Sequence, residues 1–411
     1  MPAVHHKRTC CRACESARLT LFLELGNQPL ANAFLASPEE FPAEAAYPLN
    51  VYFCESCSLV QLLDVIDPAV LFRNYIYVTG TSDTIARHNA TYARTVTGLL
   101  GLGPRDLVVE AASNDGSLLK EFKALGVGTL GVEPAVNLAE VARRSGIETE
   151  ATFFHSETAR RLRESYGRAK AVIGNNVLAH VDDTIDFLRG ARDLLDGSGM
   201  VIFEVPYLGE LLDRLEYDTI YHEHLCYFSV TALERLCESA GLGIARVDRV
   251  PVHGGSLRIY AAPQKDHAAG AVEMAEAERQ AGLASLERYR RFAHEVARSR
   301  EMLRNLLCRL RSEGRSIAAY GAPAKGNTLL NYCGIDTGFL PYTVDKNERK
   351  VGLYTPGMHI PVRPVATLLE EQPDDVLILA WNFAAEIMSQ QQTYRSRGGR
   401  FITPVPEPVL H

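Results

Sequence analysis

The sequence has no apolar run long enough to cross a membrane. Nowhere in its 411 residues does an apolar stretch approach the roughly 18 residues that a spanning helix needs. The first residues, MPAVHHKRTCCRAC, also lack the apolar centre of a secretory signal peptide. We therefore expect a cytoplasmic protein that does not associate with membranes.

An excess of positive charge is missing as well. Lys and Arg total 43 against 50 Asp and Glu, which gives a formal net charge of −7. Such a chain has no surplus cations to displace the counterions of a nucleic acid, so we expect no nucleic-acid partner. The charged fraction of 23% and the hydrophobic fraction of 46% argue against long disordered regions and coiled coils. The length predicts two or three globular domains.

The nine cysteines are unevenly spread, and a cytosolic chain rarely uses them for disulfides. Two C-x-x-C pairs, Cys11 with Cys14 and Cys54 with Cys57, lie in the first sixth of the chain. Each tight turn aims two thiolates at one metal ion, and two such turns complete a tetrahedral set of four sulfurs. Because four cysteines leave no open position for a catalytic water, the spacing predicts a structural zinc site.

Two alternatives remain open for this site. Cys10 could replace Cys11 as a ligand, although the spacing to Cys14 favours Cys11. Four thiolates also suit iron, so the spacing alone leaves iron as the other candidate metal.

An α/β pattern begins near residue 105. The stretch Asp106–Glu110 predicts a buried strand, Ala111–Gly116 a tight turn, and Ser117–Phe122 the start of a helix. The next strand, Gly128–Glu133, ends in an acidic residue, which is typical of sites where a carboxylate accepts ribose hydroxyls. The turn lacks the G-x-G-x-x-G pattern that cradles a diphosphate, so S-adenosylmethionine (SAM) fits better than NAD. We assign these residues to the SAM site: Glu110, Asn114, Asp115, Gly116, Glu133, Asn175 and Asn176.

Polar residues also follow two further predicted strands. Ala171–Gly174 leads into Asn175–Asp183, and Gly199–Glu204 leads into Val205–Tyr207. Open α/β sheets bind ligands at these carboxyl ends of strands. The densest polar cluster comes next, in Tyr217–Tyr227, where a histidine beside a glutamate suits a general base near neutral pH. A solvated turn, or a second metal site using His222 and His224, is the alternative interpretation.

The C-terminal third predicts a helical connection and a second α/β unit. Residues 266–313 have helical spacing and many charges, which indicates a helix bridging two domains. The strand Ser316–Tyr320, the small-residue loop Gly321–Gly326 and a helix from Asn327 follow. Lys325 at this helix N-terminus suits a phosphate, because backbone N–H groups and the helix dipole both face it. Later strands are predicted at Leu340–Val344, which ends at Asp345, and at Asp375–Ala380.

Together these motifs resemble the SAM-dependent sugar C-methyltransferases of bacterial deoxysugar biosynthesis, in particular the C-3 methyltransferases of mycarose-like and tetronitrose-like sugars. The resemblance spans essentially the whole chain. It rests on these sequence motifs: Cys11-x-x-Cys14, Gly26-Asn-Gln-Pro-Leu-Ala-Asn-Ala-Phe34, Cys54-x-x-Cys57, Ser113-Asn-Asp-Gly116, Asn175-Asn-Val-Leu-Ala-His180, Glu204-Val-Pro-Tyr207, Asp218-Thr-Ile-Tyr-His-Glu-His224, Lys325-Gly-Asn-Thr-Leu-Leu-Asn331 and Leu353-Tyr-Thr-Pro-Gly357.

The resemblance implies an α/β fold in three parts: a small zinc-binding N-terminal domain, a Rossmann-like SAM methyltransferase core and a second Rossmann-like domain that helps hold a dTDP-linked 4-keto sugar. We place these parts at residues 1–75, 76–265 and 314–411, with 266–313 as the helical linker. The implied reaction transfers a methyl group from SAM to C-3 of that sugar, in antibiotic deoxysugar biosynthesis. We predict a monomer.

The resemblance also implies roles for single residues. His224 is the expected base, and Tyr221 and Glu223 belong to the same active-site motif. His180 and Tyr75 match residues that line the same pocket. From the chemistry of the reaction, our hypothesis is that His180 is a candidate donor to the C4 oxygen. To the sugar nucleotide we assign Lys325, Asn327, Asp345 and Tyr207. Two departures from the family pattern stand out: Ala112 replaces an expected glycine, which could weaken SAM binding, and Pro323 interrupts an Ala-rich run.

Two other functions are alternatives at this point. An NAD-dependent nucleotide-sugar dehydrogenase or epimerase would need a diphosphate-binding glycine turn, which neither glycine loop supplies. A non-catalytic zinc-ribbon interaction module would need a basic surface, and the residues around the cysteines provide only a small one.

Overall fold

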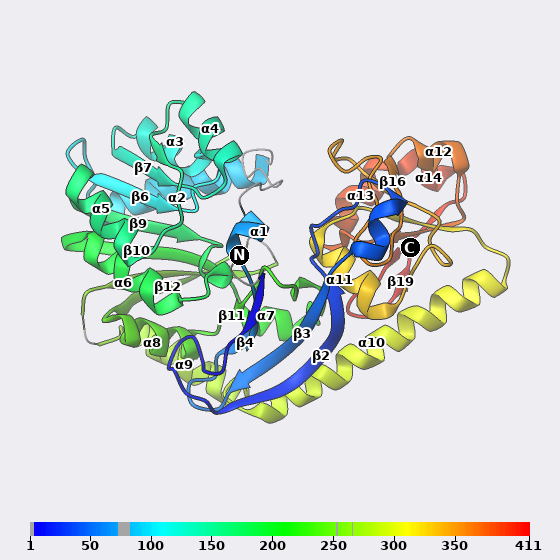
Figure 1. Cartoon of the computed structure of the whole chain (residues 1–411), viewed down its shortest axis with the longest axis horizontal. Coiled ribbons are helices and arrows are strands. Elements are labelled where there is room, and N and C mark those ends of the chain that lie inside the picture. Colours follow the sequence, from blue (N-terminus) through cyan, green and yellow to red (C-terminus); the bar gives the residue numbers. More distant parts are fainter. Residues whose placement is uncertain (1–3, 73–82, 252–253, 265) are drawn as a thin grey trace.

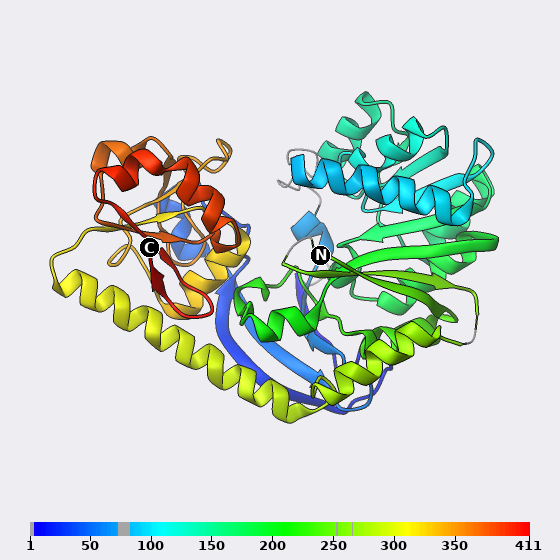
Figure 2. The same cartoon turned by 180° about the vertical axis from the view of Figure 1, so that it is seen from behind.

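The computed structural model describes residues 4–72, 83–251, 254–264 and 266–411. Two α/β units stand apart at opposite ends of the molecule, and a long hairpin with a long helix runs beneath both of them (Figures 1 and 2). The hairpin consists of β2 (Leu19–Pro29) and β3 (Ala46–Cys54), and the helix is α10 (Leu286–Ser312). The segment from β2 to β3 therefore contributes to the frame that connects the two units.

The hairpin belongs to a four-stranded antiparallel sheet in the order β11-β4-β3-β2. β4 (Val60–Leu62) follows β3 directly, but β11 (Cys226–Tyr227) comes from the middle of the chain. Cys226 pairs with Gln61, and Tyr227 pairs with Val60. Beside this sheet, β1 (His5–Lys7) pairs with β5 (Asp64–Ile66). The N-terminal sheet is therefore completed by a segment from the central unit.

The central unit is a seven-stranded sheet in the order β12-β13-β10-β9-β6-β7-β8. The five strands from β6 to β10 run parallel, and β13 returns antiparallel between β10 and β12. Their bounds are β6 Leu107–Ala111, β7 Gly128–Val132, β8 Thr149–Glu150, β9 Ala169–Asn175, β10 Leu195–Pro206, β12 Gly243–Val250 and β13 Ser256–Ala262.

Both faces of this sheet are buried, which explains why its strands are continuous apolar runs. Val108 packs on the face covered by α2 (Asp83–Leu100) and α3 (Ser117–Ala124), together with Tyr92 and Phe122. Val109, one residue further along β6, belongs to the core on the opposite face, which α6 (Thr184–Leu194) and α8 (Val230–Ala240) cover. The predicted strands at 106–110, 128–133, 171–174 and 199–204 are confirmed to within a few residues.

The C-terminal unit is a six-stranded sheet in the order β16-β15-β14-β17-β18-β19, parallel except for β19. Its first strand, β14, has the second strand on one side and the later β17 on the other, which creates a topological switch point. The helix α11 begins at Ala324 rather than at the predicted Asn327, so Lys325 lies in its first turn. The bounds are β14 Ile317–Tyr320, α11 Ala324–Cys333, β15 Thr343–Asp345, β16 Val362–Pro364, β17 Asp375–Ile378, β18 Arg400–Thr403 and β19 Val409–Leu410.

The predicted helical linker contains two helices. α9 (Ala269–Gln280) packs near α8, and α10 follows after a break at Gly282, whose φ is +84°. In the described ranges no helix is both long and apolar enough to span a bilayer. The exact division of the chain at residues 75, 265 and 313 stays a prediction. The remaining helices are η1 Pro38–Ala43, α1 Pro68–Phe72, α4 Val136–Arg144, α5 Ser156–Tyr166, η3 Leu178–His180, α7 Leu208–Asp213, η4 Tyr217–Thr219, α12 Thr367–Glu371, η5 Trp381–Phe383, α13 Ala384–Gln390 and α14 Gln392–Ser396.

Candidate active site and zinc centre

The four predicted cysteines converge on one point. Cys11 Sγ lies 3.5 Å from Cys57 Sγ, and Cys14 Sγ lies 3.6 Å from Cys54 Sγ. All four sulfurs lie within 4.8 Å of one another. A tetrahedral zinc ion with Zn–S bonds of about 2.3 Å needs sulfurs separated by about 3.8 Å, so the donor set fits zinc without rearrangement. The alternative ligand Cys10 is not part of this group.

The zinc turns are attached to the central unit by a buried arginine. The Arg12 side chain is fully buried and forms an ion pair with Asp182, at 3.0 Å between Nη2 and the carboxylate. Arg8 reaches the same carboxylate at 3.2 Å. The hydroxyl of Thr184, which begins α6, donates to the carbonyl of Arg12. The metal site therefore stabilises the N-terminal sheet where that sheet contacts the methyltransferase-like core.

The turn after β6 has the shape predicted for a nucleoside site. Ala112, Asn114 and Gly116 all adopt positive φ, at 56°, 51° and 74°. Glu133, which follows β7, accepts the N–H of Asn114 at 2.8 Å and the N–H of Ala135 at 2.8 Å. This carboxylate thus joins the two loops at the carboxyl ends of neighbouring strands, which places the predicted SAM residues of both strands together.

The same corner brings several buried carboxyl groups together. Glu110 is buried, and its Oε2 has no hydrogen-bond partner in the described part of the chain. Burial raises the pKa of Glu110 well above its ordinary value, with Asp115 and Glu133 adding to the effect. On the neighbouring strand end, Asn176 has a φ of 52° and a buried Oδ1 that has no partner among the described residues. Unsatisfied acceptors among carboxylates fit a ligand that is cationic and rich in hydroxyl groups, as SAM is.

Two histidines of the predicted active site have defined tautomers. His224 Nδ1 lies 2.8 Å from the carbonyl oxygen of Thr219, and His180 Nδ1 lies 2.6 Å from that of Glu223. A carbonyl oxygen only accepts, so each Nδ1 carries the proton and each neutral ring has its lone pair on Nε2. The two rings face each other with centroids 4.9 Å apart. Burial lowers the pKa of His180 to about 4, so this ring is neutral near pH 7.

This arrangement corrects the role that we predicted for His180. A donor to the C4 oxygen would need a proton on Nε2, but the carbonyl of Glu223 holds the proton of the neutral ring on Nδ1. Nε2 of His180 is therefore a hydrogen-bond acceptor.

The other predicted residues of this segment lie around the two rings. The ring of Tyr221 is 4.1 Å from that of His224, and Glu223 Oε1 accepts the side-chain amide of Asn32 at 2.7 Å. Phe72, at the end of α1, contacts the His180 ring edge-on at 5.4 Å. Tyr75 lies outside the described residues. We predicted no role for Asn32. Its place in the Gly26–Phe34 motif was the one sequence feature that could have indicated a function.

His222 points away from this group. Its Nε2 faces the carbonyl oxygen of Pro48 at 3.3 Å, and its ring packs edge-on against Tyr47 of β3. Of the described residues, only the four cysteines form a metal-ligating group of three or more His, Cys, Asp or Glu side chains. The alternative metal site built on His222 and His224 is therefore not formed.

The predicted sugar-nucleotide residues are distributed over two regions. Lys325 Nζ lies 4.1 Å from the centre of the Trp381 ring, and Asp345 accepts the N–H of Ala322 at 2.7 Å and that of Asn347 at 2.8 Å. Asn327 is buried and donates to the carbonyl of Ala31 at 2.7 Å, so it holds the N-terminal loop against α11.

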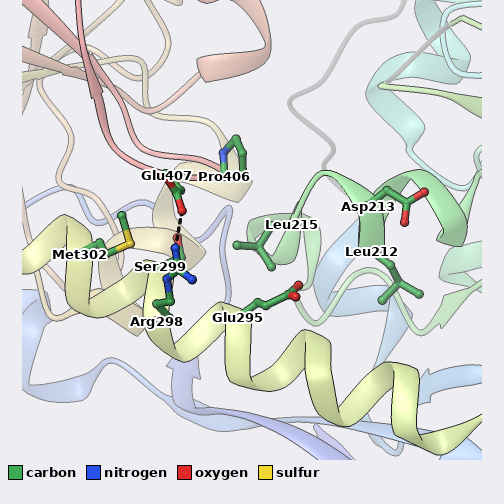
Figure 3. A pocket seen from close by; sticks show the side chains of 9 residues that line it. All are labelled: Leu212, Asp213, Leu215, Glu295, Arg298, Ser299, Met302, Pro406 and Glu407. Carbon is green, nitrogen blue, oxygen red and sulfur yellow. Dashed lines mark hydrogen bonds and ion pairs between the residues drawn. The ribbon is translucent and has the colours of Figure 1, made fainter.

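Tyr207 belongs to another place. It lines a cavity of about 340 Å³ with Glu210, Arg214 and Arg249, and the lining includes neither Lys325 nor His224. A second cavity, of about 220 Å³, lies between α10 and the C-terminal segment, where Arg298 pairs with Glu407 at 2.6 Å (Figure 3). Neither cavity contains the predicted base.

A buried charged cluster near the carboxyl end of β10 was not predicted. Glu204 accepts Arg258 Nε at 2.7 Å and lies 3.0 Å from His88 Nε2. Arg258 also stacks over Tyr92, 3.9 Å from its ring centre. These residues come from α2, β10 and β13, so only the fold brings them together.

Known proteins match the chain over nearly its whole length. One family model, described as a zinc binding domain, matches residues 11–72, a methyltransferase domain model matches residues 86–247, and a C-methyltransferase C-terminal domain model matches residues 251–406. The C-methyltransferase NovU of Streptomyces niveus is 38% identical over 401 residues, which cover 97% of this chain and 96% of that protein. The chain belongs to the SAM-dependent C-methyltransferase family.

This C-methyltransferase also has solved structural neighbours of its central part. Magnesium protoporphyrin IX methyltransferase from Synechocystis PCC 6803, with bound SAM, is 15% identical, covering 44% of this chain and 82% of that one, with a TM-score of 0.33. The CcbJ methyltransferase from Streptomyces caelestis is 14% identical, covering 47% and 95%, with a TM-score of 0.35. The family match confirms the predicted resemblance and decides against both alternatives, the NAD enzyme and the zinc interaction module.

Proposed function

We propose that this methyltransferase transfers the methyl group of SAM to C-3 of a dTDP-linked 4-keto deoxysugar in antibiotic biosynthesis, with His224 as the base. The observation that carries the proposal is the hydrogen bond from His224 Nδ1–H to the carbonyl of Thr219. It keeps the proton of the neutral ring on Nδ1 and leaves Nε2 as the basic atom. A base with a fixed tautomer and orientation is what proton removal next to a ketone requires.

The chemistry follows from the ketone. A carbonyl at C4 acidifies the hydrogen on C3, so a base within hydrogen-bond reach generates an enolate. When bound, SAM supplies the electrophilic methyl group that the enolate carbon accepts. The neutral His180 beside His224 adds no positive charge, so it does not oppose protonation of the base.

A residue of the N-terminal domain forms a hydrogen bond with Glu223. Asn32 donates to its carboxylate, while its own backbone carbonyl fixes His180. We assign Glu223 and Tyr221 to positioning the base and the sugar, because both contact the ring pair rather than the bulk of the sheet. Tyr75 keeps its predicted place in the pocket as a proposal.

The dTDP group is proposed to bind at the C-terminal switch point. The small-residue loop after β14, the first turn of α11 with Lys325, and Asp345 at the end of β15 lie there. A lysine in the first turn of a helix attracts a diphosphate, because its charge adds to the helix dipole and the exposed backbone N–H groups. Asn327 and Tyr207 remain weaker parts of this assignment, because the first is engaged with Ala31 and the second lines a separate cavity.

The test uses mass spectrometry of a dTDP-4-keto-2,6-dideoxyhexose incubated with the protein, in H2O and in D2O. The wild type should add one methyl group with SAM present and exchange the C3 hydrogen for deuterium with SAM omitted. His224→Ala should slow both by about 10²- to 10⁴-fold, the usual contribution of a general base. SAM affinity should not change, because His224 is not among the residues assigned to SAM.

The matched control is His294→Ala, which removes an exposed histidine on α10 and should leave both rates unchanged. Near-normal exchange in folded His224→Ala would assign the base to another residue. If neither product nor exchange appears with 3-amino and 3-hydroxy sugars, the proposed substrate class is wrong.

A further inference from the structure

The single tryptophan of the chain links the two α/β units through one hydrogen bond. Trp381 begins η5, directly after the carboxyl end of β17. Its Nε1–H donates to Asp218 Oδ2 at 2.6 Å, 163 positions away in the sequence. Asp218 lies in η4 and is fully buried, so this bond forms away from solvent, where a hydrogen bond between protein groups is stronger than in water.

Asp218 is the residue before the one that orients the proposed base. Thr219 ends η4, and its carbonyl oxygen accepts the Nδ1–H of His224. The intervening chain is a tight turn, because Ile220 N–H donates to Tyr217 O and His224 N–H donates to Tyr221 O. A shift of η4 therefore moves the carbonyl that sets the tautomer and direction of the His224 ring.

The rest of η4 also lies against the C-terminal unit. The Tyr217 hydroxyl is 3.7 Å from Cys333 Sγ, and the Tyr217 ring contacts Tyr332 edge-on with centroids 5.6 Å apart. Cys333 and Tyr332 are on α11. These contacts are mostly apolar and fix the distance of η4 from α11. The bond from Trp381 to Asp218 adds a short polar contact between η4 and the C-terminal unit.

We propose that Trp381 is a positioning residue for the base. Through Asp218 and the carbonyl of Thr219, the C-terminal unit sets the orientation of His224, although the proton is removed in the central unit. The inference rests on the proposed role of His224 and extends it to a residue without contact to the reacting atoms.

Trp381→Phe tests this inference, because phenylalanine keeps an aromatic face for Lys325 and removes the N–H donor. We expect kcat for C3 hydrogen exchange to fall by about 10- to 10²-fold, as for a catalytic group displaced by a fraction of an ångström to an ångström. The KM for the nucleotide sugar should change by less than about threefold, since no substrate contact is lost. An unchanged kcat, or a raised KM with unchanged kcat, would overturn the proposal.

The control is Phe383→Leu, which changes a side chain that is 56% exposed on the same 3-10 turn and should behave as wild type. A double-mutant cycle sharpens the test. Asp218→Asn weakens the same bond, so the double variant with Trp381→Phe should be about as slow as the slower single variant. Multiplicative losses would mean that the two residues act independently, and the proposal would be wrong.

A spectroscopic measurement separates positioning from general loss of structure. In ¹⁵N-histidine-labelled protein, the His224 signal is assigned by its absence in His224→Ala. It should report a proton on Nδ1 in the wild type and a mixture of tautomers in Trp381→Phe. If Trp381→Phe does not fold, Asp218→Asn must show the mixture instead, and an unchanged His224 signal in the folded variant would refute the proposal.

The outcomes distinguish the two proposals. Normal exchange in His224→Ala refutes the role of the base, whatever Trp381→Phe does. Slow exchange in His224→Ala together with normal exchange in Trp381→Phe refutes only the positioning role.

Discussion

The two α/β units build the same turn from different residues. In each, the first residue after the first strand has a left-handed backbone: Ala112 after β6, with φ at 56°, and Gly321 after β14, with φ at 89°. Glycine adopts this conformation freely, whereas a side chain with a Cβ is strained there. The resemblance had led us to expect glycine at position 112, and the backbone now gives the physical reason. The central unit accepts strain at a position where the C-terminal unit has none.

Each unit has an acidic residue at the end of its second strand, Glu133 at β7 and Asp345 at β15. The two side chains make the same kind of hydrogen bonds, but different charged groups surround them. Glu133 and Asp345 each accept one N–H from the first loop and one from the residue two positions further on. Around Glu133 the neighbours are further carboxylates, including the buried Glu110. Beside Asp345 lies Lys350, whose Nζ donates to the carbonyl of Ala322. One scaffold thus underlies both the proposed cation site for SAM and the proposed anion site for the diphosphate.

Among the changes that test this comparison, the largest effect is expected from replacing each acid by its amide in turn. Glu133→Gln should raise the Kd for SAM by about 10- to 10²-fold, because hydrogen bonds to charged groups contribute about 1.5 to 3 kcal/mol. It should leave dTDP binding unchanged, and Asp345→Asn should do the reverse. Isothermal titration calorimetry with SAM and with dTDP measures both. A loss of SAM affinity in Asp345→Asn would erase the distinction between the two sites.

The pH dependence of SAM binding follows from the same carboxylate. Burial raises the pKa of Glu133, so it takes up a proton at a higher pH than an ordinary glutamate. SAM affinity should therefore be greatest above the raised pKa and should fall as the pH decreases through it. In Glu133→Gln this part of the pH dependence should disappear.

Substitutions at the two left-handed turn residues, Ala112→Gly and Gly321→Ala, should change the free energy of unfolding in opposite directions. Ala112→Gly should stabilise the protein by roughly 0.5 to 1 kcal/mol, the left-handed strain less the entropy cost of glycine. Gly321→Ala should destabilise it by about 1 to 2 kcal/mol or more, since the new Cβ would also lie 3.2 Å from Ala380 Cβ. Urea unfolding monitored by circular dichroism measures both. Destabilisation by Ala112→Gly would show that the alanine methyl has a packing role that outweighs its strain.

The smallest effect is expected at the anion site. Lys325→Ala should raise the nucleotide-sugar KM about fivefold, the upper range for a partly exposed ion pair, and the change should shrink with added salt. The SAM Kd should stay constant. Lys346→Ala is the matched control, because this exposed lysine bonds to Gln390 on the same unit. Equal KM values in the wild type and Lys325→Ala would remove Lys325 from the diphosphate site.

Features encoded by local spacing were predictable from the sequence. The strand ends at Glu110, Glu133 and Asp345, and the four zinc cysteines, depend on residues within a few positions of a recognisable turn. The link between Asn32 and Glu223 was not predictable, because 191 positions separate them. Nor was the tautomer of His180, since a backbone carbonyl in a distant loop decides it. Side-chain identity names the groups at a site, but the fold determines which hydrogen bond each one makes.

The position of β11 has a consequence for domain exchange within the family. Cys226 and Tyr227 form the outer strand of the N-terminal sheet, and Leu62 N–H bonds to Leu225 O, one residue after His224. A chimera that replaces only the first 67 residues would leave this strand against a foreign partner. The part of the chain that can be exchanged as a unit is therefore discontinuous in sequence. A working chimera must take the zinc domain and the segment with the proposed base from the same parent, because that segment completes the sheet of the zinc domain.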